Sequence, residues 1–343
     1  MEEAFGGREK MRKMLLICGA LFFWVLPFLS AEEKAPASSG EIQAALARGE
    51  ALRQKKHIVA DMLQSYTVLT KIGGEPCGFA RVALEDAQGE GSATYRLVEQ
   101  FTATVANSRQ RAKISYNGSY LLGADLGLVS GTLHAQTDSK SADKEQKVHL
   151  SARIETQDGN LTWQVEQRDQ DGKTQPLREK QSLDLHGVRP IPSNALNVLA
   201  SFAANKESIC VPALEINWQM ISFDAIPAWL SFVPPAAVHP PGATVAMLVR
   251  YLVGEITDKG LAVEVPTPEV WGQVAPWLLD NSGRVLALPP QEDLRLTIEL
   301  GSGKETSPDF DMNKIEAVTK KFEEIKQQQM QAGETHFQPA DGR

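Results

Sequence analysis

The sequence lacks the short motifs that identify most enzyme classes. It contains no glycine-rich nucleotide-binding loop, no Gly-x-Ser-x-Gly nucleophile elbow and no His-Glu-x-x-His zinc motif. Its 6 histidines are scattered, and no two of them have the spacing of metal ligands. The sequence therefore predicts a non-enzymatic protein with no catalytic residue, no cofactor and no metal site, and it ranks an unrecognised hydrolase last among the functions considered.

Basic residues are in the minority. The 343 residues include 35 Lys and Arg against 43 Asp and Glu, which gives a formal net charge of −8 at pH 7. Binding to phosphates needs a concentrated basic face, so this balance argues against nucleic acid as the main partner. It also disfavours electrostatic docking on anionic lipid. Lipid chains, other apolar ligands and envelope proteins remain candidate partners.

Cysteine is scarce, and each of the 3 cysteines has a different setting. Cys18 lies in an apolar run near the N-terminus, which leaves Cys77 and Cys210 in the rest of the chain. In an oxidising compartment these two could form one disulfide. The alternative is two separate buried thiols, because cysteine is often simply a core residue. Their spacing fits no metal or redox motif.

The apolar run near the N-terminus has the order of an export signal. Basic residues between Arg8 and Lys13 precede residues 14–29, and the small residues Ser30 and Ala31 follow. This pattern predicts a signal peptide over residues 1–31 with cleavage after Ala31. The alternative is an uncleaved anchor, although a helical span needs about 20 apolar residues. We expect a secreted, periplasmic or cell-envelope protein that contacts the membrane only through this segment during export.

The rest of the chain reads as a β body between two helices. Residues 32–40 are a linker, and the capping-box spacing of Ser38 and Glu41 predicts a helix over residues 41–64. Residues 65–305 then alternate between apolar and polar side chains, punctuated by turn residues such as Asp158-Gly159. Within this body we expect a polar loop over residues 138–146 and a short helix capped by Ser193.

The C-terminal region predicts a second long helix. Ser307-Pro308 would open it, and it would run over residues 307–332, followed by a disordered tail at 333–343. Its apolar stripe can pack on its own sheet or on another chain. The stripe consists of Ile315, Val318, Phe322 and Ile325. The fold class is therefore mainly β (α+β): a large curved antiparallel sheet or half-open barrel with an N-terminal helix, a short central helix and a C-terminal helix.

One insert, residues 211–241, differs in composition from the rest of the body. It is rich in proline, and proline cannot donate to a ladder, so we expect no regular central strand through much of it. Its large aromatic residues could line an apolar cavity or form a lid, and are then candidate ligand-binding residues. The alternative is that they fill the core. These residues are Trp218, Phe223, Trp229 and Phe232.

Two short patterns indicate a family. Tyr66–Ile72 is followed by the hairpin segment Gly73–Phe79, and Trp277–Asp280 is followed by Gly283–Ala287. On these segments, the stretch from about residue 64 to 300 resembles uncharacterised secreted bacterial β proteins whose sheet is similar to the lipoprotein-carrier (LolA/LolB-like) half-barrel. The resemblance implies a curved sheet that is partly closed by helix and holds a lipid chain. It supplies no catalytic residues, and the proline-rich insert departs from the compact carrier pattern.

These observations lead to one main functional hypothesis. The chain is expected to be an exported, non-enzymatic envelope protein that binds an apolar ligand or a protein partner in a curved β sheet. The alternative is a scaffold or assembly protein that acts through its terminal helix.

Overall fold

A computed structural model describes thirteen stretches of the chain. They are residues 39–54, 64–87, 93–107, 110–141, 144–168, 172–202, 207–217, 221–233, 247–252, 254–263, 275–279, 285–287 and 296–334. The predicted signal peptide, most of the linker and the C-terminal tail lie outside these residues. Within the described part of the chain, no helix is both long and apolar enough to span a membrane.

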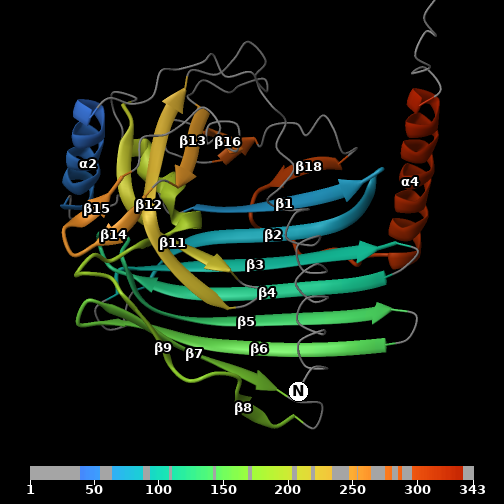
Figure 1. The fold of residues 1–343 in the computed structure, drawn as a ribbon, viewed down its shortest axis with the longest axis horizontal. Helices are drawn as coiled ribbons and strands as arrows, with labels where there is room; N and C mark the ends of the chain where they lie inside the picture. The colour runs from blue at the N-terminus through green and yellow to red at the C-terminus, as the bar shows by residue number, and fades with distance from the viewer. Residues whose placement is uncertain are drawn as a thin grey trace, which may run out of the picture.

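Ten strands form the larger sheet, which is antiparallel and curved (Figure 1). Their spatial order is β18-β1-β2-β3-β4-β5-β6-β7-β8, and β9 pairs with β7 beside β8. The strands are β1 Gln64–Ile72, β2 Glu75–Asp86, β3 Tyr95–Ala106, β4 Gln110–Leu122, β5 Leu128–Ser141, β6 Lys144–Gln157, β7 Asn160–Arg168, β8 Thr174–Pro176, β9 Gln181–Asp184 and β18 Leu296–Gly301. The sheet does not close into a barrel, and the predicted fold class is confirmed.

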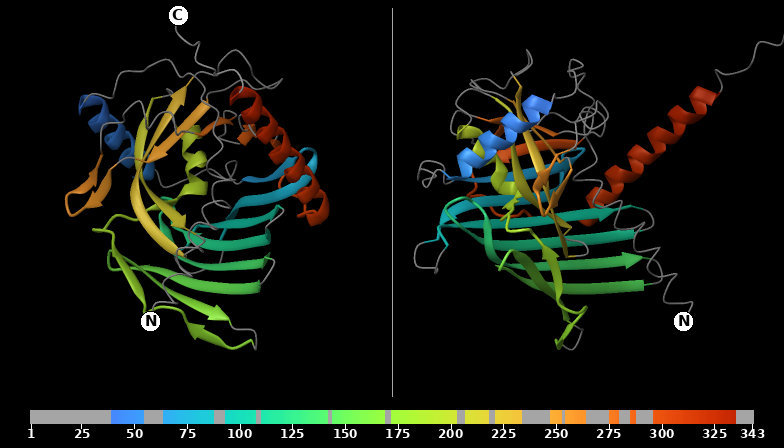
Figure 2. Two further views of the ribbon diagram at one scale, coloured as in Figure 1. Left: turned by 45° about the vertical axis from the view of Figure 1, so that its right-hand side comes forward. Right: turned by 60° about the vertical axis from the view of Figure 1, so that its left-hand side comes forward.

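A second sheet of six strands packs against the first (Figures 1 and 2). Its order is β10-β11-β12-β13-β16-β17, where β10 and β11 are parallel and the other pairs are antiparallel. Its strands are β10 Ile191–Pro192, β11 Ile209–Asn217, β12 Ser222–Val233, β13 Met247–Leu252, β16 Ala275–Leu279 and β17 Val285–Ala287. The remaining elements are the hairpin β14 Glu255–Thr257 and β15 Gly260–Ala262, the helices α2 Ser39–Gln54 and α4 Met312–Glu334, and the 3-10 helix η2 Ser193–Phe202.

Turn chemistry sets the hairpins of the large sheet. Asp158 and Gly159 connect β6 to β7 with φ angles of 52° and 78°, as a two-residue type I′ turn requires. Gly73 and Gly74 connect β1 to β2 in the same way, with φ angles of 55° and 91°. The Asp-Gly turn expected from the sequence is thus confirmed.

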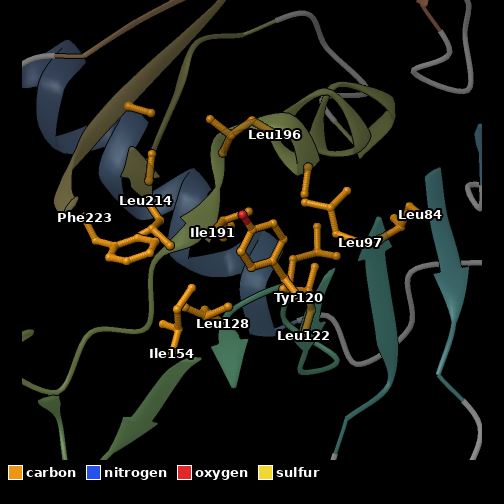
Figure 3. Close-up of a cluster of buried hydrophobic side chains, with 14 of the residues drawn as sticks. Leu84, Leu97, Tyr120, Leu122, Leu128, Ile154, Ile191, Leu196, Leu214 and Phe223 are labelled. Carbon is orange, nitrogen blue, oxygen red and sulfur yellow. The ribbon is translucent and has the colours of Figure 1, made fainter. Parts of the chain in front are cut away.

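The hydrophobic core lies between the two sheets, on the face of the large sheet that carries Leu97, Tyr120 and Leu133, which we call the inner face (Figure 3). Side chains alternate along each strand, so the opposite, outer face carries the intervening polar residues. Leu196 of η2 and Leu214 of β11 contribute to the same core from the other side. All five of these side chains are completely buried.

One expectation about the meander is wrong. Residues 138–146 were expected to form a polar loop, but Asp138–Ser141 and Lys144–Gln146 pair as the ends of β5 and β6. Opposite charges face each other there, as in Lys140↔Glu145, so a polar ladder is stabilised without apolar side chains.

The aromatic and proline-rich insert contains regular strands, which corrects a second expectation. Pro212 of β11 lies directly opposite Pro227 of β12, inside a nine-residue antiparallel ladder. On its other side β11 pairs with β10, and this pairing begins at Ala213, one residue after Pro212. In the same way β12 pairs with β13 only from Ala228, one residue after Pro227. Each proline therefore lies where the outer ladder has not begun, so its missing N–H costs no hydrogen bond there.

Both terminal helices differ in extent from their predictions. The first begins at Ser39 and is helical as far as Gln54, whereas the predicted range was 41–64; β1 already begins at Gln64, and residues 55–63 lie outside the described residues. The last spans Met312–Glu334 and not 307–332, because its first turn is capped by Asp311. The Asp311 carboxylate accepts hydrogen bonds from the backbone N–H groups of Asn313 and Lys314 at 3.0 and 3.2 Å. Ser307-Pro308 precedes this cap in an extended segment.

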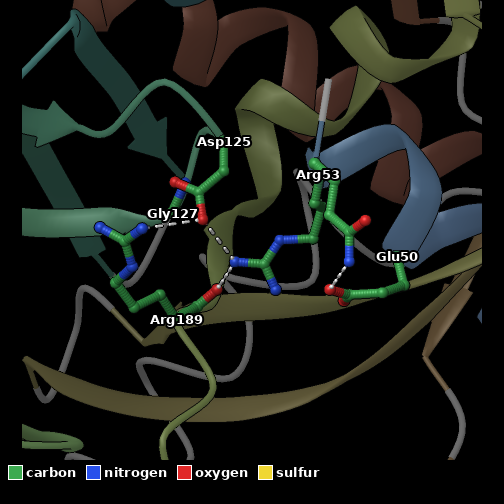
Figure 4. A network of polar contacts seen from close by, with 6 residues as sticks. Glu50, Arg53, Asp125, Gly127 and Arg189 are labelled. Atoms are coloured by element: carbon green, nitrogen blue, oxygen red, sulfur yellow. Dashed lines mark hydrogen bonds and ion pairs between the residues drawn. The ribbon is translucent and has the colours of Figure 1, made fainter. Parts of the chain in front are cut away.

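A partly buried ion-pair network attaches α2 to the large sheet (Figure 4). The guanidinium of Arg53 donates to Asp125 at 3.1 Å and to the backbone oxygen of Arg189 at 2.6 Å. Arg189 also donates to Asp125, at 3.0 Å. Burial lowers the pKa of Arg53, and the adjacent carboxylate of Asp125 opposes this effect. Gly49 completes the docking, because a Cβ there would lie 1.9 Å from the backbone oxygen of Cys210.

The stripe on α4 packs on its own sheet through its first half. Ile315 is 2% exposed, and a Cβ at Gly73 would meet Val318 at 2.7 Å and Phe322 at 3.4 Å. Arg111 forms an ion pair with Glu316 on the same helix. Of the two alternatives for this stripe, intramolecular packing is therefore what the described contacts show for Ile315, Val318 and Phe322.

Candidate functional site

Two of the four aromatic residues proposed as ligand contacts, Phe223 and Trp229, are buried. Phe223 is 2% exposed and packs edge-to-face against Trp163, with ring centroids 5.2 Å apart. Trp229 is 3% exposed and lies opposite Cys210. The backbone of Phe232 in β12 pairs with that of Leu248 in β13, and Trp218 lies outside the described residues. Phe223 and Trp229 fill the core, which is the alternative interpretation of this segment.

The two cysteines of the β body are free and belong to different sheets. The thiol of Cys77 in β2 donates a hydrogen bond to the backbone oxygen of Thr70, and Cys210 lies buried in β11. Burial raises the pKa of Cys77 to about 11 and that of Cys210 to about 12. The structure thus has two separate thiols and no disulfide between them.

Burial changes along the inner face of the large sheet, and this gradient defines the candidate site. At one end Leu97, Leu133 and Ile154 are at most 1% exposed. Farther along the same strands, Phe101, Ala135 and Leu150 are only half-buried, although they lie on the same face. In Figure 1 the second sheet lies in front of the left-hand part of β3–β6, and the right-hand ends of these strands extend beyond it.

This part of the inner face crosses seven strands, and half-buried side chains alternate there with buried ones such as Val68 and Tyr116. Strand register places one side chain from each strand in a transverse row, and a second row lies two residues farther on. The first row consists of Leu300, Val68, Ala80, Phe101, Tyr116, Ala135 and Leu150. In the second row Ile114 is 2% exposed and Val148 is half-buried. We call these two rows the apolar strip.

A buried polar cluster borders the apolar strip on its covered side. Glu99 of β3 is 6% exposed and lies opposite Gly118 of β4. Its carboxylate accepts hydrogen bonds from the Tyr116 hydroxyl at 2.8 Å and from the Asn194 amide at 2.9 Å. The hydroxyls of Tyr116 and Tyr120 are hydrogen-bonded to each other. A buried carboxylate is therefore held by donors from β4 and from η2 of the opposite layer.

The electrostatics of this cluster keep both tyrosines protonated. Tyr116 and Tyr120 have pKa values well above the usual one, because burial disfavours the phenolate and the charge of Glu99 repels it. Neutral hydroxyls can donate, whereas phenolates cannot, so the cluster requires the protonated form. The sequence analysis missed this buried polar cluster, which lies between the covered core and the apolar strip.

The described residues of the inner face combine apolar side chains with one buried polar cluster. Within the described residues, no group of three or more His, Cys, Asp or Glu side chains could hold a metal ion. The alternation Leu97-x-Glu99-x-Phe101 places Glu99 on the core face, and this pattern was the one sequence signal that could have identified it. What the arrangement can do is present an apolar surface next to fixed hydrogen-bonding groups.

Comparisons with known proteins give two distant structural neighbours. The sequence matches no protein-family model and no curated protein. The chain is similar to a β-barrel-like protein of the domain of unknown function DUF1849 from Brucella abortus, with 12% identity, coverage of 65% of this chain and 89% of that one, and a TM-score of 0.36.

A second structural match is similarly distant. A DUF1089 family protein from Pseudomonas aeruginosa is 16% identical, with coverage of 62% and 89% and a TM-score of 0.29. These neighbours agree with the expected resemblance to uncharacterised bacterial β proteins. The likeness to lipoprotein carriers is not confirmed, and neither neighbour indicates a function.

Proposed function

We propose that this chain is an exported, non-enzymatic envelope protein that binds the hydrocarbon chain of an amphiphile on the apolar strip. The observation that carries the proposal is the burial gradient of the inner face, from Leu97 and Ile154 to the half-buried Phe101 and Leu150. Apolar side chains that stay half-buried beside a closed core offer area that a ligand can still bury, and such area supports a binding site.

The chemistry of the strip favours a flexible aliphatic ligand. Ala80 and Ala135 carry the smallest side chains of the first row, and Phe101, Val148 and Leu150 add larger apolar side chains on the same face. Burial of each methylene of such a ligand contributes about 0.8 kcal/mol. The assembly function that was the alternative gains no support, because Ile315, Val318 and Phe322 are used within the protein.

The test is a fluorescence titration with dansyl-labelled undecanoic acid on wild-type protein and a matched pair of variants. Leu150→Glu places a carboxylate on the strip, whereas Ser151→Glu places the same group one residue later on the outer face. We expect the inner-face variant to weaken binding by about tenfold or more, because the acyl chain would have to desolvate the new charge. The outer-face variant should bind as the wild type does.

Ala135→Trp serves as an uncharged second variant in case Leu150→Glu folds poorly. It places a bulky side chain in the middle of the first row, and it should reduce binding while thermal unfolding stays cooperative. If the labelled acid does not bind, or if it binds equally to the wild type and to both inner-face variants, the apolar strip is not its site.

A further inference from the structure

The outer face of the large sheet carries a row of hydrogen-bonding side chains at its centre. Strand register aligns them side by side across five strands, as Thr67↔Arg81↔Gln100↔Asn117↔His134. Gln100, Asn117 and His134 are exposed, and Arg81 is half-buried. Guanidinium and amide groups in one row provide closely spaced donors and acceptors.

The segment that follows β18 turns this row into a groove. Residues 302–307 cross the outer face over β1 and β2 and enclose a cavity of about 550 Å³. A volume of this size accommodates a small molecule. Its polar lining includes Arg81, Gln100, Thr102, Asn117, Lys304 and Ser307.

Glu305 fixes the wall of the groove. Its carboxylate accepts hydrogen bonds from the Thr67 hydroxyl at 2.6 Å, from the Ser302 N–H and hydroxyl at 2.9 Å, and from the Gly303 N–H at 2.9 Å. Gly303 has a φ of 85°, and a Cβ there would lie 2.3 Å from the Ser65 hydroxyl, so the segment approaches β1 as closely as only glycine allows. The groove is therefore formed before any ligand arrives.

The cations of the groove have unused bonding capacity among the described residues. Neither Arg81 nor Lys304 forms an ion pair among the residues that the structure describes, and the Nε of Arg81 is buried there without a hydrogen bond. Leaving a charged donor unsatisfied in a partly buried position costs free energy. The acidic group of the groove, Glu305, is already satisfied by the donors of its own turn. The groups of the groove that can still bind a ligand are therefore its two cations and its side-chain amides.

We propose that this groove is a second binding site, for a sugar-sized ligand that carries a carboxylate or phosphate group. Arg81 is the group for the anion, because a guanidinium pairs with either oxyanion through two parallel hydrogen bonds. Lys304, which is exposed at the rim, adds a second positive charge. The amides of Gln100 and Asn117 and the hydroxyls of Thr102 and Ser307 match the hydroxyl groups of a sugar ring. The site lies on the face opposite to the apolar strip, so it stands or falls independently of the proposed function.

The experiment is a set of NMR titrations with three probes: glucuronate, glucose 6-phosphate and glucose. We expect at least one of the charged sugars to bind about tenfold or more tightly than glucose, since a charge-assisted hydrogen bond is lost with the neutral probe. Which of the two acids binds identifies the anionic group. If neither acid binds more tightly than glucose, the proposal is overturned.

Two variants and a matched control locate the site. Arg81→Gln should weaken binding of the preferred acid by about tenfold. Arg153→Gln removes the same charge from the same face of β6, outside the groove, and should leave binding unchanged. Asn117→Asp changes an exposed side chain and should also weaken binding, because it adds a negative charge to the groove. Equal affinities for Arg81→Gln, Asn117→Asp and the control would show that the acid binds elsewhere.

Discussion

Glu99 of β3 lies directly across the sheet from Gly118 of β4, and the buried polar cluster exists because Gly118 has no side chain. A Cβ at Gly118 would lie 2.6 Å from the Tyr120 hydroxyl and 2.7 Å from that of Tyr116. The two tyrosines occupy that space and bring their hydroxyls together beside the carboxylate. Position 118 is therefore as important for the cluster as the charged residue that it faces.

Gly118→Ala should destabilise the protein. The added methyl group would push the tyrosine hydroxyls away from Glu99, and overpacking of this kind costs about 1–3 kcal/mol. Urea unfolding followed by circular dichroism measures the change. Ser119→Ala, one residue later on the outer face, is the control and should change the free energy of unfolding by less than about 0.5 kcal/mol. Equal stability of Gly118→Ala and the control would contradict the geometry of the cluster.

The raised pKa values of Tyr116 and Tyr120 predict instability in alkali. A group whose pKa is higher in the folded state contributes stability below its unfolded pKa and loses it as pH rises toward the folded value. The window therefore begins near pH 10, the ordinary tyrosine value. Tyrosinate absorbance should show that at least two of the 5 tyrosines, Tyr116 and Tyr120 among them, ionise only when the protein unfolds. In Tyr120→Phe, one tyrosine fewer should ionise only on unfolding. If all five tyrosines of the folded wild type ionise near the ordinary pKa, the prediction is refuted.

The two thiols should be unreactive in the folded protein. Thiolate is the reactive form, and pKa values of about 11 for Cys77 and about 12 for Cys210 leave very little of it at neutral pH. Iodoacetamide should modify both cysteines only after denaturation, as followed by mass spectrometry without reductant. Rapid modification of the folded protein would contradict the raised pKa values. If the denatured protein has no reactive thiol and its mass is lower by about two hydrogen atoms, the cysteines are joined in a disulfide and the crosslinked alternative holds.

Glu305 should make the outer-face segment sensitive to acid. Its hydrogen bonds to Thr67, Ser302 and Gly303 lower its pKa from 4.5 to about 2. A depressed pKa contributes stability above the unfolded value and loses it as pH falls through the folded value, so the window lies between 4.5 and about 2. Melting temperatures of wild type and Glu305→Gln should converge over this window. A constant difference between them from neutral pH to pH 2 would show that the carboxylate does not act through its charge.

Most of the fold follows from local sequence patterns. Alternation and Asp-Gly turns locate the meander from β1 to β7, because each hairpin is a contact between neighbours in the sequence. The division into two sheets does not follow, since β18 returns from the far end of the chain to pair with β1. Alternation gives no information about such long-range partners. Proline was misleading for the same reason: Pro212 and Pro227 are tolerated because of where the outer ladders begin.

The candidate site was harder to predict from the sequence than the fold was. The ligand-binding prediction was based on the large aromatic residues of the insert, but Phe223 and Trp229 are core residues. The apolar strip consists of ordinary residues such as Ala135 and Leu150, which look the same whether the core covers them or not. Only the extent of the second sheet distinguishes the two cases, and that is a property of the tertiary structure.

Native mass spectrometry of the mature protein, purified from its own host, tests the binding proposal most directly. We expect an additional mass that organic extraction removes and that belongs to an amphiphile with an alkyl chain. The bound fraction should fall in Leu150→Glu and persist in Ser151→Glu. Detection of the bare polypeptide mass alone, for the wild type purified under the gentlest conditions, would contradict the assignment of the apolar strip as a binding surface.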